Sequence, residues 1–471
     1  MAMQAPTLLR FLSLLFGLAL AGCVGVSRPP AVSADLPQAF PAYDDAAGPG
    51  PGGDGALPGW RSFFSDPGLV ALIEAALAHN RDLRVVQAQV EEARALYGIQ
   101  SAARLPEIDV NATGTRGRTP ADLSLTGVAT VAGQYRVGLA LPAFEIDFWG
   151  RVRSLEQAAL AQYLSTEEAR TAFELSLVAT VANSYLLARE LDERIVLARR
   201  TLESREESLR IMRRRAEVGV SSDLEVRQVE GLLLATRGEL ATLERLRAQN
   251  EALLQQLAGH ALPADPPGGL ETQGLPEALP AGLPSALLAR RPDLRAAEQR
   301  LRAAEANVGA ARAAFFPNIS LTGFAGTASA ELDGLFRAGS GSWSFTPVLH
   351  LPLFDGGRLR ANLDLAEARR NGAVAGYEAD VQTAFREVAE ALAAHHWLGR
   401  QVAAQGELVA AERERARLAE LRYERGVSSY LDVLDAQRGL FAAEQALVQL
   451  RRARMSAMVD LYKTLGGGQL P

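Results

Sequence analysis

The sequence predicts a mainly α-helical fold combined with membrane-type β-strands, built from two internal repeats. Segments that begin at Asn80 and at Arg291 align with each other, and matches at offsets of roughly 210 residues run through the body of the chain. Residues 151–216 contain neither proline nor glycine, which indicates a very long helix. Four short segments alternate apolar and polar side chains, the pattern of a strand with one apolar face. Each repeat therefore carries long helices and a pair of two-faced strands.

The composition narrows the class of protein. The 471 residues are 48% hydrophobic and 22% charged, a balance typical of folded domains. Lys and Arg (49) against Asp and Glu (55) give a net charge of −6, so no basic excess indicates a nucleic-acid partner. The single cysteine, Cys23, excludes an internal disulfide and a zinc site of several cysteines. Covalent attachment of a group to Cys23 is the role that its position favours.

Residues 1–22 resemble a bacterial lipoprotein signal peptide. Arg10 precedes the apolar run Phe11–Ala21, and the motif LAGC ends at Cys23. A run of about 11 residues is too short to cross a hydrocarbon core of about 30 Å as a helix. We therefore expect cleavage before Cys23 and lipidation of its thiol; an ordinary secretory peptide cleaved elsewhere is the alternative. The resemblance also implies that Val24, in place of an aspartate, favours delivery to the outer membrane.

Proline and glycine divide the remaining chain into four segments. Residues 23–58 are rich in both and predict a lipidated N-terminal tether. The first repeat covers 59–262, a Pro/Gly connector covers 263–283, and the second repeat covers 284–471. The two repeats are thus joined through a segment that is a poor helix or strand.

Each repeat begins and ends with segments that predict helices. Apolar residues recur at helical spacing over 67–105, with Asp66 as the N-cap and Pro67 as the first helical residue. The stretch 151–216 and its counterpart 358–425 predict helices of about 100 Å at 1.5 Å per residue. Each turns at Gly219 or Gly426 and returns through about 40 residues, as in an antiparallel helical hairpin.

The four alternating segments predict strands over about 106–118, 131–145, 317–329 and 342–354. Segments of this length are long enough for a tilted crossing of an outer membrane. Four strands cannot close a barrel alone, and an open edge in lipid leaves backbone groups unsatisfied, so the barrel must be shared between chains. A soluble sheet packed on helices explains the alternation equally well and is the alternative.

Several quoted segments together resemble one known family. They are the lipoprotein signal, the segment WRSFFSDPGLVALIEAALAHNRDLRVVQAQVEEARA from Trp60, RRPDLRAAEQRL from Arg290, FPNISL, LPLFDGGRLRA, and the run from Tyr423 to the C-terminal glycines. This combination, which covers nearly all of the mature chain, resembles the TolC-like outer-membrane efflux lipoproteins of the OprM/NodT type.

The resemblance implies an architecture and partners. It implies a homotrimer whose twelve strands form one outer-membrane β-barrel, continuous with a periplasmic α-helical barrel of twelve helices. It also implies docking to a periplasmic adaptor, a membrane fusion protein, and to an inner-membrane pump of the resistance-nodulation-division (RND) class. The chain would be anchored in outer-membrane lipid, and conduction through it would be passive.

Two groups of candidate functional residues follow from this resemblance. The hairpin tips both contain the letters GVSS, with a glycine suited to a helix-ending turn; good turn chemistry alone is the alternative reading. The expected adaptor contacts are Arg215, Gly219, Val220, Ser221, Ser222, Arg425, Gly426, Val427, Ser428 and Ser429.

The expected gate lies just after the second tip. Asp432, Asp435 and Arg438 are spaced three apart and can share one helix face, with Leu431 beside them. In a trimer, six carboxylates would ring the periplasmic entrance and favour cations, while Arg438 pairs with Asp435 or with a neighbouring helix. A solvated charged face is the alternative. The first repeat offers Leu224, Glu225, Arg227 and Gln228 instead, so the second hairpin should build the constriction.

No other chemistry is indicated. His395 and His396 lie on different sides of a helix without a ligand at helical spacing, and no phosphate loop or nucleophile motif occurs. We expect no cofactor, no metal and no enzymatic activity. The function that the resemblance implies is an exit duct for drugs or other small molecules; heavy-metal efflux, type I protein secretion, or a purely structural periplasm-spanning lipoprotein are the alternatives.

Overall fold

The computed structural model describes residues 40, 57–124, 127–260, 269–270, 273–276, 279 and 290–468. They form two compact units. Among the described residues, unit 1 holds 92–164 and 298–376, and unit 2 holds the remainder. The signal segment with Cys23, most of the tether and most of the connector lie outside the described residues, so the predictions made for them remain predictions.

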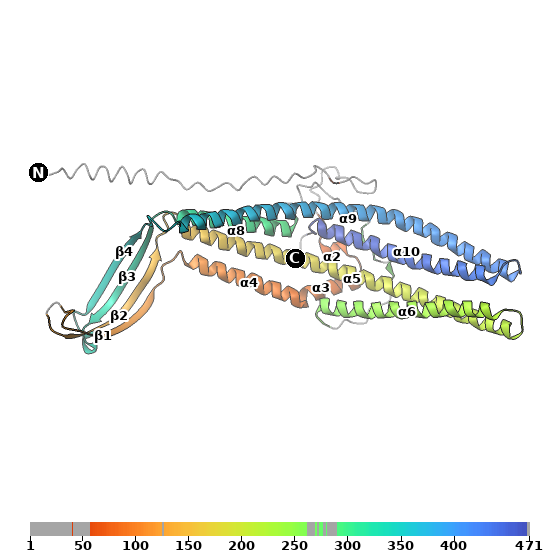
Figure 1. Ribbon diagram of the computed structural model, residues 1–471, viewed down its shortest axis with the longest axis horizontal. Coiled ribbons are helices and arrows are strands. Elements are labelled where there is room, and N and C mark those ends of the chain that lie inside the picture. Colours follow the sequence, from red (N-terminus) through yellow and green to blue (C-terminus); the bar gives the residue numbers. More distant parts are fainter. Residues whose placement is uncertain are drawn as a thin grey trace. The chain divides into compact units, whose positions relative to one another are not determined.

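Unit 1 contains one antiparallel sheet with the strand order β1-β2-β3-β4 (Figure 1). The strands are β1 (Asp109–Thr119), β2 (Thr130–Glu145), β3 (Asn318–Ser329) and β4 (Gly341–His350). They fall within a few residues of the four predicted segments. The largest difference is at the end of β4, which stops at His350, two residues before a proline that has no N–H to donate. A short 3-10 helix, η2 (Leu332–Gly334), lies in the β3–β4 connection.

The strand register sorts the side chains into two chemically different faces. Val110 pairs with Leu139, Leu139 pairs with Ala325, and Ala325 pairs with Trp343, so these four side chains share one face. Val110 is 79% exposed and Trp343 is 80% exposed, so this chain does not cover the face. The residues on this apolar face include Val110, Ala112, Val137, Leu139, Leu141, Ile319, Leu321, Ala325, Trp343, Phe345, Pro347 and Leu349. The opposite, polar face includes Asn111, Thr113, Gln134, Arg136, Ser320, Thr322, Ser342, Ser344, Thr346 and His350.

Two long helices begin just after the strand pairs. In unit 1, Trp149 donates through Nε1 to the carbonyl of Pro317 at 2.8 Å, and its ring stacks on Phe316 at 4.9 Å. Arg151, the first residue of the first long helix, donates to the Glu145 carboxylate that ends β2. These contacts fix the turn between strand and helix. The long helices are α5 (Arg151–Glu217) and α9 (Arg358–Glu424), and their return helices are α6 (Asp223–Ala258) and α10 (Tyr430–Thr464).

The prediction of one continuous helix over 67–105 was wrong. The chain forms α3 (Pro67–His79) and α4 (Arg81–Ala102), separated at Asn80, and α8 (Pro292–Ala313) is the counterpart of α4. The side chain of Asn80 accepts from the N–H of Leu83 at 2.9 Å and donates to the carbonyl of Leu257 at 3.0 Å. Asparagine favours such a cap, and the contact with Leu257 is with a distant segment that local periodicity does not reveal.

The main hydrophobic core lies in unit 2 and gathers segments from both repeats. A short helix that the sequence patterns did not predict, α2 (Trp60–Phe63), inserts its aromatic rings there. Phe63 stacks on Tyr462 of α10 at 4.2 Å, and the Tyr462 hydroxyl donates to the carbonyl of Pro58 at 2.9 Å. The predicted N-cap, Asp66, accepts from Gly68 and Leu69, as well as from the hydroxyl of Tyr185 on α5. The start of the folded body is thereby fixed to the two helices that lead to the tips.

Polar contacts join the first and second hairpins along α5 and α10. Arg194 donates to Gln445, and the Gln445 amide donates back to the carbonyl of Arg194. Glu190, whose side chain is 4% exposed, accepts from both Arg194 and Arg452. α5 also contains an 18-residue window apolar enough to span a membrane, but 56% of that window is buried in the protein, as in a core helix.

Candidate functional site

The first hairpin tip ends α5 with a glycine in the left-handed region. Gly219 has φ +72°, and its N–H donates to the carbonyl of Ala216 at 2.9 Å. The next N–H, of Val220, donates to the carbonyl of Arg215 at 2.8 Å. This pair of bonds is the Schellman motif, which satisfies carbonyls that the helix end leaves free. Ser222 then caps α6, with Glu225 completing a capping box.

The second tip repeats the same backbone geometry. Gly426 has φ +69° and donates to the carbonyl of Tyr423 at 2.9 Å, while Val427 donates to the carbonyl of Arg422 at 2.9 Å. The next helix, α10, starts differently from α6: its N-cap Ser429 makes no side-chain capping hydrogen bond. The acidic residue of the first turn, Asp432, therefore does not complete a capping box. The two tips share their turn and differ in how the following helix is secured.

The outer surface of both tips is small, apolar and exposed. Val218, Val220 and Val427 are 69%, 63% and 65% exposed. Behind them lies a shared cluster that packs the two hairpins together, consisting of Leu209, Met212, Val229, Leu233, Tyr430, Val433 and Leu434. The tips therefore present exposed valines on a firmly packed base.

Three of the expected tip contacts have different surroundings. The guanidinium of Arg215 lies over the ring of Tyr423 at 5.3 Å, so this residue joins the first hairpin to the second. Arg425 is exposed and has no interaction partner within the described parts of the chain. Ser428 has a buried hydroxyl without a hydrogen-bond partner among the described residues. Arg425 remains accessible to another molecule, whereas Arg215 is already engaged.

The predicted gate residues divide into a paired set and a free set. Asp435 accepts from Arg438 one turn along α10, at 2.5 Å, and also from Arg415 on α9. Arg415 in turn contacts Glu412 at 3.2 Å. Leu431 is 54% exposed, and Asp432 is exposed without an ion-pair partner in the described part of the chain.

The sequence patterns missed Arg415 and Glu412. They lie on the opposite arm of the hairpin, about as far before Gly426 as Asp435 lies after it. Counting outward from the turn would have placed them together, because the arms of a hairpin run antiparallel. The hydrogen bond from Arg415 is the main reason that the pKa of Asp435 lies below its usual value, with Arg438 adding to the effect. Asp435 is thus an ionised, doubly paired carboxylate.

The arrangement changes the expected charge at the gate. Asp435 and Glu412 are balanced by Arg415 and Arg438, so this four-residue cluster carries no net charge. Of the two carboxylates that each chain was expected to contribute to the ring, Asp435 is paired and Asp432 has no ion-pair partner in the described part of the chain. Both Asp435 pairs lie within the second hairpin, and the pair with Arg415 joins α10 to α9.

The first hairpin neutralises its charges differently. Glu225 is used in the capping box, and Arg227 pairs with Glu230 at 2.6 Å. Glu230 is also paired with Arg213 on α5 at 3.1 Å. The first tip therefore has no free carboxylate at the position that corresponds to Asp432.

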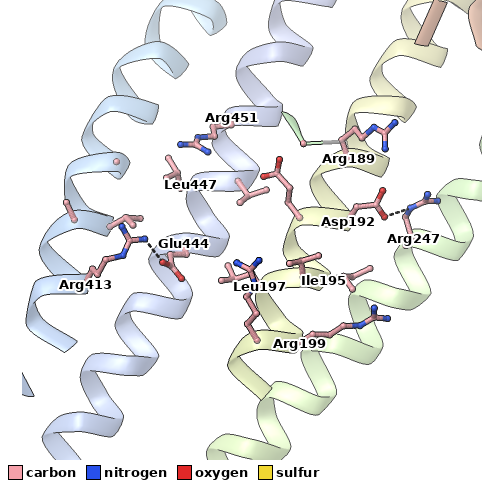
Figure 2. Close-up of a pocket in the computed structure, with 18 residues that line it drawn as sticks. Arg189, Asp192, Ile195, Leu197, Arg199, Arg247, Arg413, Glu444, Leu447 and Arg451 are labelled. Atoms are coloured by element: carbon pink, nitrogen blue, oxygen red, sulfur yellow. Dashed lines mark hydrogen bonds and ion pairs between the residues drawn. The ribbon is translucent and has the colours of Figure 1, made fainter. Parts of the chain in front are cut away.

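A groove of about 970 Å³ lies in unit 2 between the two hairpins (Figure 2). Arg413 pairs with Glu444 across α9 and α10, and Arg247 pairs with Asp192 across α6 and α5. Further arginines in its lining are Arg189, Arg199, Arg200 and Arg451. Its walls carry more positive than negative side chains. Among the described residues, no group of three His, Cys, Asp or Glu side chains could hold a metal ion.

Comparisons with known proteins agree with this geometry. The chain matches the outer membrane efflux protein family over residues 72–260 and 283–467. It is 49% identical over 415 residues to the solvent efflux pump outer membrane protein SrpC of Pseudomonas putida, covering 88% of each chain. It is 48% identical to the outer membrane protein OprJ of Pseudomonas aeruginosa, covering 87% of this chain and 86% of the relative.

A solved structure shares the fold. The open state of the MtrE outer membrane channel of Neisseria gonorrhoeae superposes with a TM-score of 0.84 at 38% identity, covering 95% of this chain and 98% of that one. The two matched regions together extend over most of the chain. The chain therefore belongs to the outer membrane efflux protein family and is an outer-membrane exit duct of an efflux pump.

Proposed function

We propose that three copies of this chain form the exit duct of a tripartite efflux system, together with a periplasmic adaptor and an inner-membrane RND pump. The observation that carries this proposal is the sheet of unit 1. It has one apolar face, one polar face, and two unpaired edges, β1 and β4. A sheet with an exposed apolar face suits lipid on that side and water on the other.

The open edges explain why several copies are needed. In lipid, every backbone N–H and C=O must find a partner, and a four-stranded sheet leaves both edge rows unsatisfied. Pairing β1 of one copy with β4 of the next satisfies both rows once the ring closes. Three copies give twelve strands, within the range of outer-membrane barrels. The polar faces then line the lumen, continuous with a tunnel of long helices.

The cargo that we propose is a class of small, largely apolar molecules, including drugs and solvents. SrpC is named as part of a solvent efflux pump, and the chain is 49% identical to it. The duct itself has no site for energy conversion in this proposal, so transport through it is passive. The inner-membrane pump supplies the energy.

The tips are the proposed adaptor-docking surface. Val220 and Val427 are exposed on a packed base, and Arg425 stands beside them without a partner in the described chain. Replacing either valine by Trp should block docking, because a large ring cannot fit where a small side chain meets another helical tip. The measurement is adaptor crosslinking in whole cells, with Leu332→Trp as the control, because this residue is also exposed but lies in the β3–β4 connection, away from the tips. If both tip variants crosslink to the adaptor and support efflux as wild type does, the docking surface lies elsewhere.

The second hairpin is the proposed gate, and Asp432 and Leu431 form the surface that contacts neighbouring copies and closes the pore. Asp435 is already paired with Arg438 on α10 and with Arg415 on α9, and the pair with Arg415 fixes α10 against α9. Asp432 has no partner in its own described chain and is free to contact a neighbouring copy. Leu431, 54% exposed, would then pack near the axis.

Lipidation of Cys23 is proposed as an additional anchor. We expect labelled palmitate to enter the wild-type protein but not Cys23→Ser, while the variant still forms pores, because the apolar face of the sheet holds the assembly in the membrane. Label in the Cys23→Ser protein would refute lipidation at this residue.

The experiment that tests the whole proposal is conductance in a planar bilayer. The purified full-length protein should run as a trimer and open discrete channels after reconstitution. A structural lipoprotein that only spans the periplasm would anchor to the bilayer without conductance. That outcome would contradict the proposed duct.

A further inference from the structure

Two arginines lie on the apolar face of the sheet. On β1, Arg116 pairs with Gly133 and Arg118 pairs with Val131. The register is continuous along the strand, so both arginines lie on the same face as Val110 and Ala112. Both are exposed, and neither has a hydrogen bond or ion pair within the described part of the chain. They are unpaired cations on a face that is otherwise suited to lipid.

An aromatic side chain lies between the two arginines and the aliphatic part of this face. Along β2, toward the β1–β2 connection, the face presents Leu139 and Val137, then Tyr135, and then the two positions that oppose the arginines. Ring atoms of Tyr135 lie within 3.4 Å of the points where Cβ atoms on Gly114 and Gly133 would stand, so the ring covers that strip. Aromatic residues border the apolar band of membrane strands at the interface with the head groups.

The position of the two arginines along β1 indicates which membrane leaflet they face. Arg116 and Arg118 lie next to Thr119, where β1 ends in the connection to β2, while the opposite end of β1 follows α4. If the helices lie in the periplasm, as the proposed function requires, this end of the sheet faces the cell exterior. A charged side chain on the lipid face is strongly unfavourable at the middle of the bilayer and nearly neutral at the interface. The two arginines therefore lie among the head groups of the outer leaflet.

We propose that Arg116 and Arg118 bind the phosphate groups of lipid A, the phosphorylated glycolipid of the outer leaflet. The guanidinium group donates two parallel hydrogen bonds to phosphate oxygens, and these charge-assisted bonds are stronger than neutral ones. Residues two apart on one strand face stand about 6.5 to 7 Å apart. The pair can thus hold one phosphate between them. This inference rests on the proposed function, because it takes the apolar face to be the lipid face.

The first test uses the wild-type protein alone. The full-length trimer in mild detergent is incubated with lipid A, with enzymatically dephosphorylated lipid A, or with lipid A plus inorganic phosphate, and bound lipid is counted by native mass spectrometry. We expect retention of lipid A at least about fivefold above the dephosphorylated lipid, because two charge-assisted contacts are lost with the phosphates. Inorganic phosphate at millimolar concentration should not displace it. Equal retention of both lipids, or full displacement by free phosphate, would overturn the proposal.

The second test uses variants with a matched control. Arg116→Gln combined with Arg118→Gln should lower lipid A retention by about fivefold to the level of the dephosphorylated lipid. The control is Arg337→Gln, an exposed arginine in the β3–β4 connection that already pairs with Asp333 at 2.6 Å. Its retention should equal that of wild type. Unchanged binding in the double variant, or an equal loss in the control, would assign lipid binding to another surface.

Conductance of the same preparations separates this inference from the proposed function. Wild type and both variants should form channels of equal conductance, because the arginines lie on the face away from the polar side chains. If none of the proteins conducts, the proposed duct fails. If all conduct and lipid A retention does not depend on its phosphates, the duct stands and the lipid site fails.

Discussion

Replacing Asp435 by Asn should change the ion selectivity of the pore more than its opening. In the wild-type chain, Asp435 and Glu412 balance Arg415 and Arg438. Asp435→Asn leaves both arginines in place and gives the cluster one net positive charge. In the proposed trimer, the periplasmic entrance gains three positive charges.

The size of the effect follows from elementary electrostatics. At about 10 Å from three unit charges in water, the unscreened potential changes the local concentration of a monovalent ion by about eightfold. Screening over a Debye length of about 10 Å at 0.1 M salt reduces this to about twofold for each sign of ion. The anion-to-cation permeability ratio should therefore rise by about fivefold. At 1 M salt, where the Debye length is about 3 Å, the difference should nearly vanish.

The assay is the reversal potential in a planar bilayer under a salt gradient. Asp432→Asn is the matched comparison, since it removes the same charge from a residue that has no partner in the described chain, so selectivity should shift by a similar factor while the hairpin keeps its ion pairs. We expect Asp432→Asn to raise open probability, because it removes the proposed contact between copies. If Asp435→Asn leaves selectivity unchanged at low salt, or if its effect persists at 1 M salt, the neutral-cluster reasoning is wrong.

The same cluster predicts a pH dependence. The hydrogen bond from Arg415 holds the pKa of Asp435 below its ordinary value of 3.8. A carboxylate with a lowered pKa keeps its contribution above the ordinary value and loses it only as the pH falls through the lowered pKa. Wild-type selectivity due to this cluster should therefore be constant between about pH 7 and about pH 5. Bilayer recordings across this range measure it, and a transition centred near pH 5 would contradict the assignment.

Three further predictions concern folding. Gly326→Ala should abolish assembly of the proposed trimer, because a Cβ there would stand 2.2 Å from the carbonyl oxygen of Val137, whereas Gly117→Ala, with open space around it, should assemble normally in the same crosslinking assay. Asp66→Ala should lower the melting temperature of the detergent-solubilised protein, since it removes an N-cap worth about 1 to 2 kcal/mol; an unchanged melting temperature would show that the cap contributes nothing. Ser222→Ala should speed amide exchange in the first turn of α6 by about fivefold, while Ser429→Ala should change α10 little, because only Ser222 makes a capping bond.

The sequence patterns located the strands and tips because their signals are local. Alternation of period two marks a strand that has one apolar face, and it recurs in both repeats. A glycine followed by Val-Ser-Ser ends each long helix, and both glycines have the positive φ that such a turn requires. These features depend on neighbouring residues only, so a single sequence suffices to find them.

The features that were missed depend on distant contacts. Asn80 interrupts a helical pattern because it can also reach the carbonyl of Leu257. Trp60 and Phe63 form a short helix whose rings fill a core that includes Tyr462, a residue near the other end of the chain. Arg415 reaches Asp435 only because two helices run side by side. The hydrophobic periodicity of a sequence indicates which face of an element is apolar, but it does not indicate which other element covers that face.

The pairing of β2 with β3 also constrains the order in which the protein can fold. The β1–β2 and β3–β4 hairpins join neighbouring segments, but Ala140 must pair with Phe324, across most of the first repeat and the connector. Closing a loop of about 180 residues has a large entropic cost, and it cannot begin until β3 has been exported. Two separate ribbons should therefore exist in the periplasm while export is still under way. The sheet becomes a single surface ready for insertion only after the later ribbon arrives.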